Sequence, residues 1–170
     1  LCHLEELYLG WNSFDAAPAV IGELASLVKL DLSNCGITSI PSSFKNLVEL
    51  KHLDLLNNDL KGFPEVILSM TMMKELILLN NRITAIPVEI NQLENLIELN
   101  LEDTRLKEIP DTISELEKLK KLNLSYNNLK VIPPGLSNLD SLYTLELKHN
   151  PWSEFYKIHI IRDNSAQTII

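Results

Sequence analysis

The chain has 170 residues, of which 45% are hydrophobic and 22% are charged, and its formal net charge at pH 7 is −8. This length suits one domain, and an acidic chain without basic runs argues against nucleic acid or an anionic membrane as the main partner. No window approaches about 18 uninterrupted apolar residues, so we expect no integral membrane segment.

A large apolar residue recurs every 23 positions without an insertion. A fixed period of this size is typical of a solenoid, in which each repeat buries its apolar side only against its neighbours. Leu1 falls where a preceding repeat would end, so we expect an array truncated at its N-terminal side. The recurring residues are Leu4, Leu27, Leu50, Met73, Leu96, Leu119 and Leu142.

Each repeat contains a Leu-x-Leu segment, such as Leu53-Asp54-Leu55, whose alternation of inward and outward residues predicts a half-buried strand. Equal spacing with a covered crossover requires parallel strands. The apolar spacing of three at Phe44, Leu47 and Leu50 predicts a 3₁₀ helix or a single α turn on the opposite side. Because this arm is wider than the strand, we expect the stack to curve with the strands on the concave face.

A proline stands at one fixed position of the connecting arm in five repeats, and we expect it to be the first residue of each short helical turn. These residues are Pro41, Pro64, Pro87, Pro110 and Pro133.

The full pattern, L-x-x-L-x-L-x-x-N-x-L-x-x-I-P-x-x-I-x-x-L-x-x-L, resembles the leucine-rich repeat family over residues 1 to about 155. Pairs such as Ile40-Pro41 and Ile86-Pro87 are similar to those of the intracellular subclass of Ras suppressors, Scribble-type scaffolds and Roco proteins. The resemblance implies an α/β fold: a solenoid of about seven repeats, with a curved parallel sheet on the concave face and short helical or 3₁₀ arms on the convex face.

A polar residue occupies the ninth position of most repeats, where the pattern places it inside the array. Buried amides must be hydrogen-bonded, so we expect these side chains to tie successive repeats together, and we expect Cys35 and Thr104 to weaken that ladder locally. The column is Asn12, Cys35, Asn58, Asn81, Thr104, Asn127 and Asn150.

The pattern fails after Trp152, where Tyr156 replaces the expected proline. We therefore divide the chain into a repeat array, residues 1–155, and a C-terminal cap or tail, residues 156–170. In a cap, Trp152, Phe155, Ile158 and Ile161 would close the core; the other interpretation is the entry to a further domain.

Secreted members of the family usually carry cysteine clusters at both ends, whereas this chain has only Cys2 and Cys35. This difference favours a reducing compartment, so we expect a cytoplasmic protein.

No motif for catalysis, cofactor binding or metal binding stands out, since the four histidines occupy unrelated repeat positions and the glycines do not cluster. Asp31 and Asp54 recur at one strand position, so their side chains should lie about 5 Å apart. Such a pair could serve acid/base catalysis, but Leu-Asp-Leu on an open surface favours a solvated face. We expect no enzyme activity.

The outward strand positions are mostly polar, but Leu56, Ile77 and Leu79 are large and apolar in two neighbouring repeats. Apolar clusters with an acidic rim are typical of contact sites, and such a rim would favour a protein partner with basic residues. Aromatic residues are frequent binding anchors. The predicted partner-binding residues are Tyr8, Trp11, Asp31, His52, Asp54, Leu56, Glu75, Ile77, Leu79, Glu98, Glu102 and Tyr126.

These patterns predict a non-enzymatic interaction module or scaffold in intracellular signalling, which binds a protein on its concave face. Two alternatives stay open: a recognition or regulatory domain of a larger enzyme, such as a Roco-type GTPase-kinase, and a secreted or receptor recognition domain. The sequence selects neither the partner nor an oligomeric state.

Overall fold

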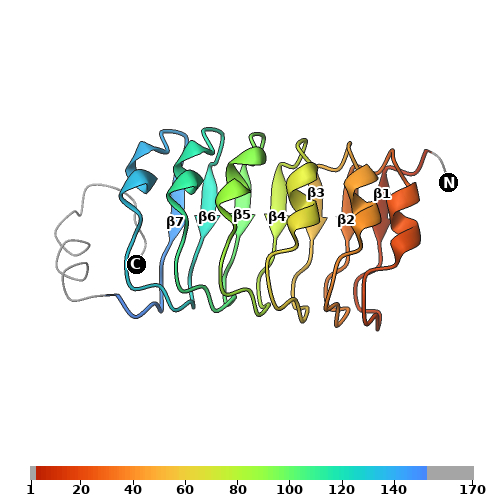
Figure 1. Cartoon of the computed structure of the whole chain (residues 1–170), viewed down its shortest axis with the longest axis horizontal. Coiled ribbons are helices and arrows are strands. Elements are labelled where there is room, and N and C mark those ends of the chain that lie inside the picture. The colour runs from red at the N-terminus through yellow and green to blue at the C-terminus, as the bar shows by residue number, and fades with distance from the viewer. Residues whose placement is uncertain (1–2, 153–170) are drawn as a thin grey trace.

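A computed structural model describes residues 3–152 of the chain (Figure 1). Over this range, seven parallel strands of three residues alternate with 3₁₀ helices, and the strand order in the sheet is the order in the sequence. The strands are β1 (Glu6–Tyr8), β2 (Lys29–Asp31), β3 (His52–Asp54), β4 (Glu75–Ile77), β5 (Glu98–Asn100), β6 (Lys121–Asn123) and β7 (Thr144–Glu146). The predicted α/β solenoid is therefore confirmed.

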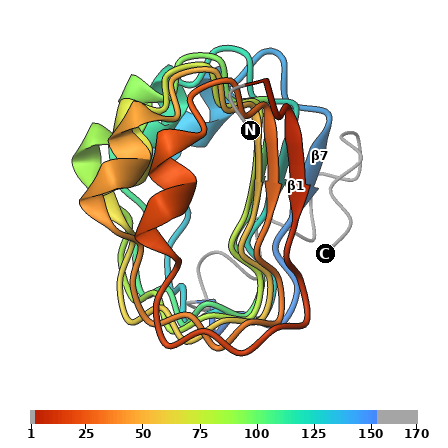
Figure 2. The same cartoon turned by 90° about the vertical axis from the view of Figure 1, so that its right-hand side faces the viewer.

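The 3₁₀ helices lie on the side of the array opposite the sheet (Figure 2). They are η1 (Ala19–Glu23), η2 (Ser42–Asn46), η3 (Glu65–Ser69), η4 (Val88–Gln92), η5 (Asp111–Glu115) and η6 (Pro134–Asn138). Seen along the stack, the end strands β1 and β7 lie farther out than the strands between them. The outer face of the sheet is therefore concave, as the width of the arms predicted.

The sequence period sets the pairing register of the sheet. Leu30 pairs with Leu53, and Asp31 pairs with Asp54. The same offset holds for every pair of neighbours from β1 to β7. Residues at one repeat position therefore lie side by side in columns across the sheet.

The interior is a continuous column of aliphatic side chains between the sheet and the 3₁₀ helices. Leu53 and Leu55 of one repeat and Leu76 and Leu78 of the next are at most 1% exposed, and Phe44 of η2 is fully buried. Burial of a leucine or phenylalanine side chain contributes about 1.5–3 kcal/mol. Shared burial between neighbours explains why strands of only three residues are stable here.

The prolines lie one residue earlier than we predicted. Pro41 precedes η2 with an extended ψ of 151°, and its carbonyl accepts the hydrogen bond of the Phe44 N–H at 3.1 Å. The prediction failed because the proline carbonyl, rather than its missing N–H, is the group that each short helix needs. In η6, Pro134 does occupy the first turn, directly after Pro133.

Trp152 ends the described part of the array. Its ring is buried, and its Nε1 donates a hydrogen bond to the Leu147 carbonyl at 3.2 Å. The other predicted cap residues, Phe155, Ile158 and Ile161, lie outside the described residues, as does the 156–170 segment. Within residues 3–152, no helix is long and apolar enough to span a membrane.

Gly22 allows η1 and η2 to pack closely, because a Cβ at this position would lie 2.5 Å from the Ser43 carbonyl oxygen. We therefore expect Gly22→Ala to force the two arms apart and to cost about 1–3 kcal/mol of unfolding free energy, measured by urea denaturation. Gly62→Ala is the matched control, since nothing lies within 4 Å of its Cβ position. Equal stabilities of the two variants would contradict this view of the arm contact.

Candidate protein-interaction face

The candidate face rests on a buried ladder of polar side chains that fixes the turns after the strands. Asn58 Oδ1 accepts hydrogen bonds from the N–H groups of Cys35 and Ile37, at 3.2 and 2.8 Å. Its Nδ2 donates to the carbonyls of Leu32 and Leu55, at 2.9 and 3.0 Å. One side chain thus satisfies backbone groups of two adjacent repeats, which confirms the predicted role of this column.

Cys35 and Thr104, which stand where other repeats have asparagine, replace different hydrogen bonds of the asparagine side chain. Cys35 Sγ still reaches the preceding repeat, where it donates to the Leu9 carbonyl at 3.2 Å. Thr104 Oγ1 instead bonds within its own repeat, to the Leu101 carbonyl at 2.8 Å, and to Asn127 Oδ1 of the following repeat. Within residues 3–152, Thr104 makes no side-chain bond to the repeat before it.

The backbone after these two residues also changes. Where the ladder residue is a buried asparagine, the N–H of the next residue donates a hydrogen bond to a carbonyl of the preceding repeat. Arg82 N–H, for example, donates to the Leu60 carbonyl at 2.8 Å. Gly36, after Cys35, and Arg105, after Thr104, instead have φ values of 69° and 70°. Neither N–H makes the equivalent bond in the described part of the chain. The ladder residue therefore decides the path of the loop that follows it.

Three aliphatic side chains lie on the concave side, as the sequence predicted. Leu56, Ile77 and Leu79 are each half-buried, whereas their sequence neighbours Leu55 and Leu78 are fully buried. Ile77 lies beside Asp54 in the sheet register. We call Leu56, Ile77 and Leu79 the aliphatic patch.

The aspartates at the ends of β2 and β3 turn the chain at the edge of the patch. Asp31 Oδ1 accepts from the Ser33 N–H and Asp54 Oδ1 from the Leu56 N–H, both at 2.8 Å. Burial raises the pKa of Asp54, and the Asp31 and Glu75 carboxylates raise it further, against the lowering effect of the Leu56 N–H. The two aspartates are lateral neighbours, so the face bears concentrated negative charge beside the patch.

Other charged residues of the face pair with the next repeat. His52 Nδ1 lies 2.9 Å from Glu75 Oε2, and Lys121 Nζ lies 2.9 Å from Glu98 Oε2. The bond to Glu98 raises the pKa of Lys121. Solvent screens such exposed pairs, so they order the face more than they stabilise the fold.

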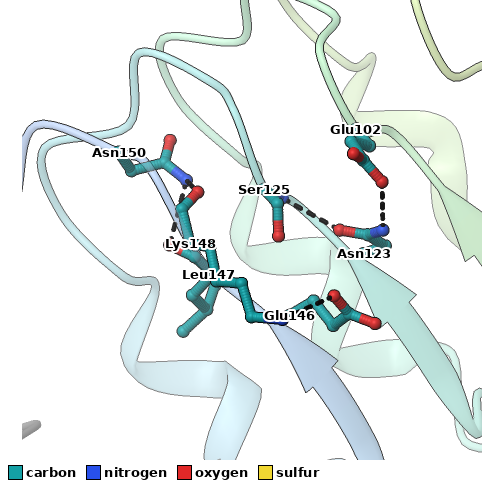
Figure 3. A network of polar contacts seen from close by, with 7 residues as sticks. All are labelled: Glu102, Asn123, Ser125, Glu146, Leu147, Lys148 and Asn150. Atoms are coloured by element: carbon teal, nitrogen blue, oxygen red, sulfur yellow. Dashed lines mark hydrogen bonds and ion pairs between the residues drawn. The ribbon is translucent and has the colours of Figure 1, made fainter. Parts of the chain in front are cut away.

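Polar contacts continue toward the C-terminal end of the face (Figure 3). Asn123 Nδ2 donates to Glu102 Oε2 at 2.8 Å, and Asn123 Oδ1 accepts from the Ser125 N–H at 3.0 Å. Lys148 Nζ lies 3.6 Å from Glu146 Oε2. Asn123 therefore repeats the turn bond that Asp31 and Asp54 make, without their charge.

The predicted aromatic anchors lie away from the aliphatic patch. Trp11 is 82% exposed, and Tyr8, on β1, has Lys29 Nζ 5.3 Å from its ring centroid. Tyr126 stacks on His149, with ring centroids 4.2 Å apart. The structure therefore brings together the aliphatic and acidic candidates, while Trp11 and Tyr126 belong to opposite ends of the face.

A column of residues with positive φ borders the face, and we did not predict this backbone conformation from the sequence. Its members precede the ladder residues: Trp11, Asn34, Asn57, Asn80, Asp103, Tyr126 and His149. Asn57 Nδ2 donates to Asn34 Oδ1 at 2.6 Å, and Asn80 Nδ2 donates to Asn57 Oδ1 at 2.7 Å. Recurrent asparagine in this column was the available signal, because asparagine tolerates the left-handed conformation.

Comparisons with protein families agree with this geometry. The leucine-rich repeat family matches residues 71–129 and 94–151, and a two-copy form of the same repeat matches residues 25–65. The chain belongs to the leucine-rich repeat family. Domains of this family are generally protein-interaction modules and are typically non-catalytic.

Solved leucine-rich repeat structures superpose closely on this array. A leucine-rich repeat protein of Leptospira interrogans is 36% identical with a TM-score of 0.84, over 88% of this chain and 38% of that one. The ectodomain of the Arabidopsis thaliana receptor kinase GASSHO1/SCHENGEN3, in complex with Casparian strip integrity factor 2, is 31% identical with a TM-score of 0.81. That match covers 89% of this chain and 19% of the ectodomain chain.

A curated relative matches a shorter part of the array. Ras guanine nucleotide exchange factor V of Dictyostelium discoideum is 52% identical over 44 residues, which is 25% of this chain and 2% of that protein. This leucine-rich repeat chain thus spans well under half the length of each protein compared.

Loss of one ladder asparagine should destabilise this leucine-rich repeat array. Asn127 Oδ1 accepts from the buried N–H groups of Thr104 and Leu106, at 3.1 and 2.8 Å. Each of these N–H groups, if left buried without an acceptor, destabilises the fold by about 1–3 kcal/mol. We therefore expect Asn127→Ala to lower the unfolding free energy by that amount or more. Exposed Asn128→Ala is the control, and similar urea midpoints for both variants would contradict the role of the ladder.

Asp54→Asn should stabilise the array at pH 7. Asparagine keeps the turn bond, as Asn100 does with the Glu102 N–H at 3.1 Å, and it removes a carboxylate that is costly to ionise. Because the folded pKa of Asp54 lies above the ordinary aspartate value of 3.8, wild-type stability falls as pH rises from that value through the folded pKa. The gain from Asp54→Asn should therefore be full at pH 7 and disappear below about pH 4.

Urea midpoints measured from pH 3.5 to 7 provide this test. Asp140→Asn, at an exposed turn, is the control for the loss of one charge and should change the midpoint less. A gain from Asp54→Asn that does not depend on pH would show that burial of the charge is not its cause.

Proposed function

We propose that this leucine-rich repeat domain is a non-catalytic module of a cytoplasmic signalling protein and that it binds a protein partner on its concave face. The observation that best supports this function is the aliphatic patch. Leu56, Ile77 and Leu79 remain accessible, although the fold has an interior that could take such side chains. Partly exposed aliphatic side chains with a polar border are typical of contact sites.

The charges beside the patch favour a partner with basic residues. Asp31 and Asp54 lie side by side, and within the described residues neither is ion-paired with a lysine or arginine. A lysine or arginine of a partner would neutralise this pair, while aliphatic side chains beside it would cover the patch. The net charge of −8 adds long-range attraction for such a partner.

Two observations favour a signalling protein inside the cell. The Ile-Pro repeat resembles that of Ras suppressors and Scribble-type scaffolds, and a 44-residue segment is 52% identical to a Ras guanine nucleotide exchange factor. Cys35 is a free thiol in the core. A buried thiol that serves as a hydrogen-bond donor fits a reducing compartment.

The second candidate function is a recognition arm of a larger enzyme. The match to the exchange factor supports it, because the same kind of repeat there occupies a small part of a much longer protein. The likeness to a receptor ectodomain leaves a third candidate, an extracellular recognition domain. The complete open reading frame separates the three, through a catalytic domain or through a leader and cysteine-rich caps.

The patch is tested by Leu56→Glu combined with Leu79→Glu in the full-length protein. We expect this variant to lose partner proteins in affinity purification with quantitative mass spectrometry, because two carboxylates would be buried in the contact. Its circular dichroism spectrum and melting temperature should change little, since both side chains reach solvent.

The control carries the same chemical change on the convex side. Val48→Glu combined with Val88→Glu alters two side chains that are 53% and 59% exposed, and it should keep the partners. If wild type and both variants recover the same proteins in affinity purification, the aliphatic patch is not the binding site.

A further inference from the structure

A polar pocket of about 240 Å³ lies at the rim of the concave face, after the ends of β3, β4 and β5. Asparagine, aspartate and arginine side chains line it. The residues that bear on its chemistry are Asn57, Asp59, Asn80, Arg82, Asp103 and Arg105, and we call this site the rim pocket.

Two charged residues of the rim pocket form an ion pair with each other, and the other two are unpaired in the described part of the chain. Arg82 Nη2 lies 2.6 Å from Asp59 Oδ1, so these two groups neutralise each other. The Asp103 carboxylate and the Arg105 guanidinium make no hydrogen bond or ion pair with any residue from 3 to 152. The pocket therefore offers a free acceptor and a free donor to the same ligand.

The asparagine chain of the rim adds a second acceptor. Its hydrogen bonds run in one direction, from Asn80 to Asn57 and from Asn57 to Asn34. Asn80 Oδ1 is left without a donor among the described residues. It belongs to the repeat next to Asp103, so two acceptors from adjacent repeats line one pocket.

The backbone holds Arg105 in the pocket wall at some cost. Its φ of 70° is a left-handed conformation, which is strained for a residue that carries a side chain. Thr104 explains this conformation, because the loops that follow buried asparagines keep an N–H bond that Arg105 lacks. Strained residues often mark functional sites, and this strain places the one free guanidinium of the pocket.

A free acceptor and a free donor in one small polar pocket match a peptide group, which has an N–H to donate and a carbonyl to accept. We infer that the rim pocket binds the main chain of the partner, with the partner N–H donated to Asp103 or Asn80 and its carbonyl accepting from Arg105. This inference rests on the proposed function of the concave face.

Main-chain binding specifies the form of the partner. A helix uses most of its main-chain groups internally, whereas an extended segment presents them along its length. The rim pocket adjoins the aliphatic patch, because Leu56 precedes Asn57 and Leu79 precedes Asn80 in the chain. An extended segment that crosses this border would place side chains on the patch and its peptide groups in the pocket.

The test uses peptides of 12 residues selected from a random phage-displayed library on the wild-type array. Isothermal titration calorimetry then compares wild type with a rim variant that combines Asn80→Gly, Asp103→Gly and Arg105→Gly, so that both acceptors and the donor are removed. These changes preserve the backbone, since all three residues have positive φ and glycine adopts the same conformation at Gly36. Lys107→Ala combined with Glu108→Ala, at exposed positions of the same repeat, is the control.

We expect the rim variant to weaken peptide binding about tenfold and the control to leave it unchanged. Each peptide is also made with single N-methyl groups along its backbone, which remove one N–H donor at a time. One such methylation should weaken binding to wild type by a similar factor, and it should have little further effect on the rim variant.

Unchanged affinity of the selected peptides for the rim variant would overturn the inference. Methylation that costs the same in wild type and in the rim variant would also overturn it. Failure of the proposed function looks different: peptides would then bind the Leu56→Glu, Leu79→Glu array as well as wild type. A library that yields no binder to the concave face would count against both.

Discussion

The structure depends on lateral pairing at a constant offset. A strand of three residues can neither bury its apolar side chains nor pair its N–H and carbonyl groups without a neighbour. Each strand therefore needs a segment that follows the same path 23 residues later, and the ladder side chains depend on the same offset. One inserted residue would move every inward leucine of the following repeat out of its column. This requirement explains why the 23-residue period of the sequence has no insertions. It also means that the chemistry of the face is decided column by column.

Within these columns, the positions that build the core alternate with positions that reach solvent. Leu55 and Leu78 face inward and belong to the core, whereas Leu56 and Leu79, one residue later, border the concave face. Charges across the face mostly find partners one repeat away, as His52 does with Glu75. The neighbouring Asp31 and Asp54 lie beside the aliphatic patch and have no ion pair within residues 3–152. A protein partner with basic and aliphatic side chains is the complement of this arrangement.

The sequence predicted the features that depend on period alone. The parallel register, the inward leucines, the asparagine ladder and the outward position of Leu56 all follow from counting residues. Features that depend on a single backbone torsion were missed. The turn of Arg105 into the left-handed region depends on Thr104 having no second amide arm, and the stack of Tyr126 on His149 depends on positive φ at both residues. The prolines were placed one residue late for a related reason: their carbonyls, rather than their nitrogens, begin the 3₁₀ helices.

Thr104 has a further consequence for how the array comes apart. Asn58 and Asn81 each reach back across a repeat boundary, to the Leu32 and Leu55 carbonyls, and Asn127 does the same to Leu101. Among residues 3–152, Thr104 makes no such side-chain bond across the boundary between β4 and β5. Within residues 3–152, this boundary is held by main-chain hydrogen bonds and core packing without a ladder side chain, so we expect the missing bond to weaken the coupling between the four strands before it and the three after it. The rim pocket has Asn80 on one side of this boundary and Asp103 on the other, so a ligand bound there would link the two parts of the array.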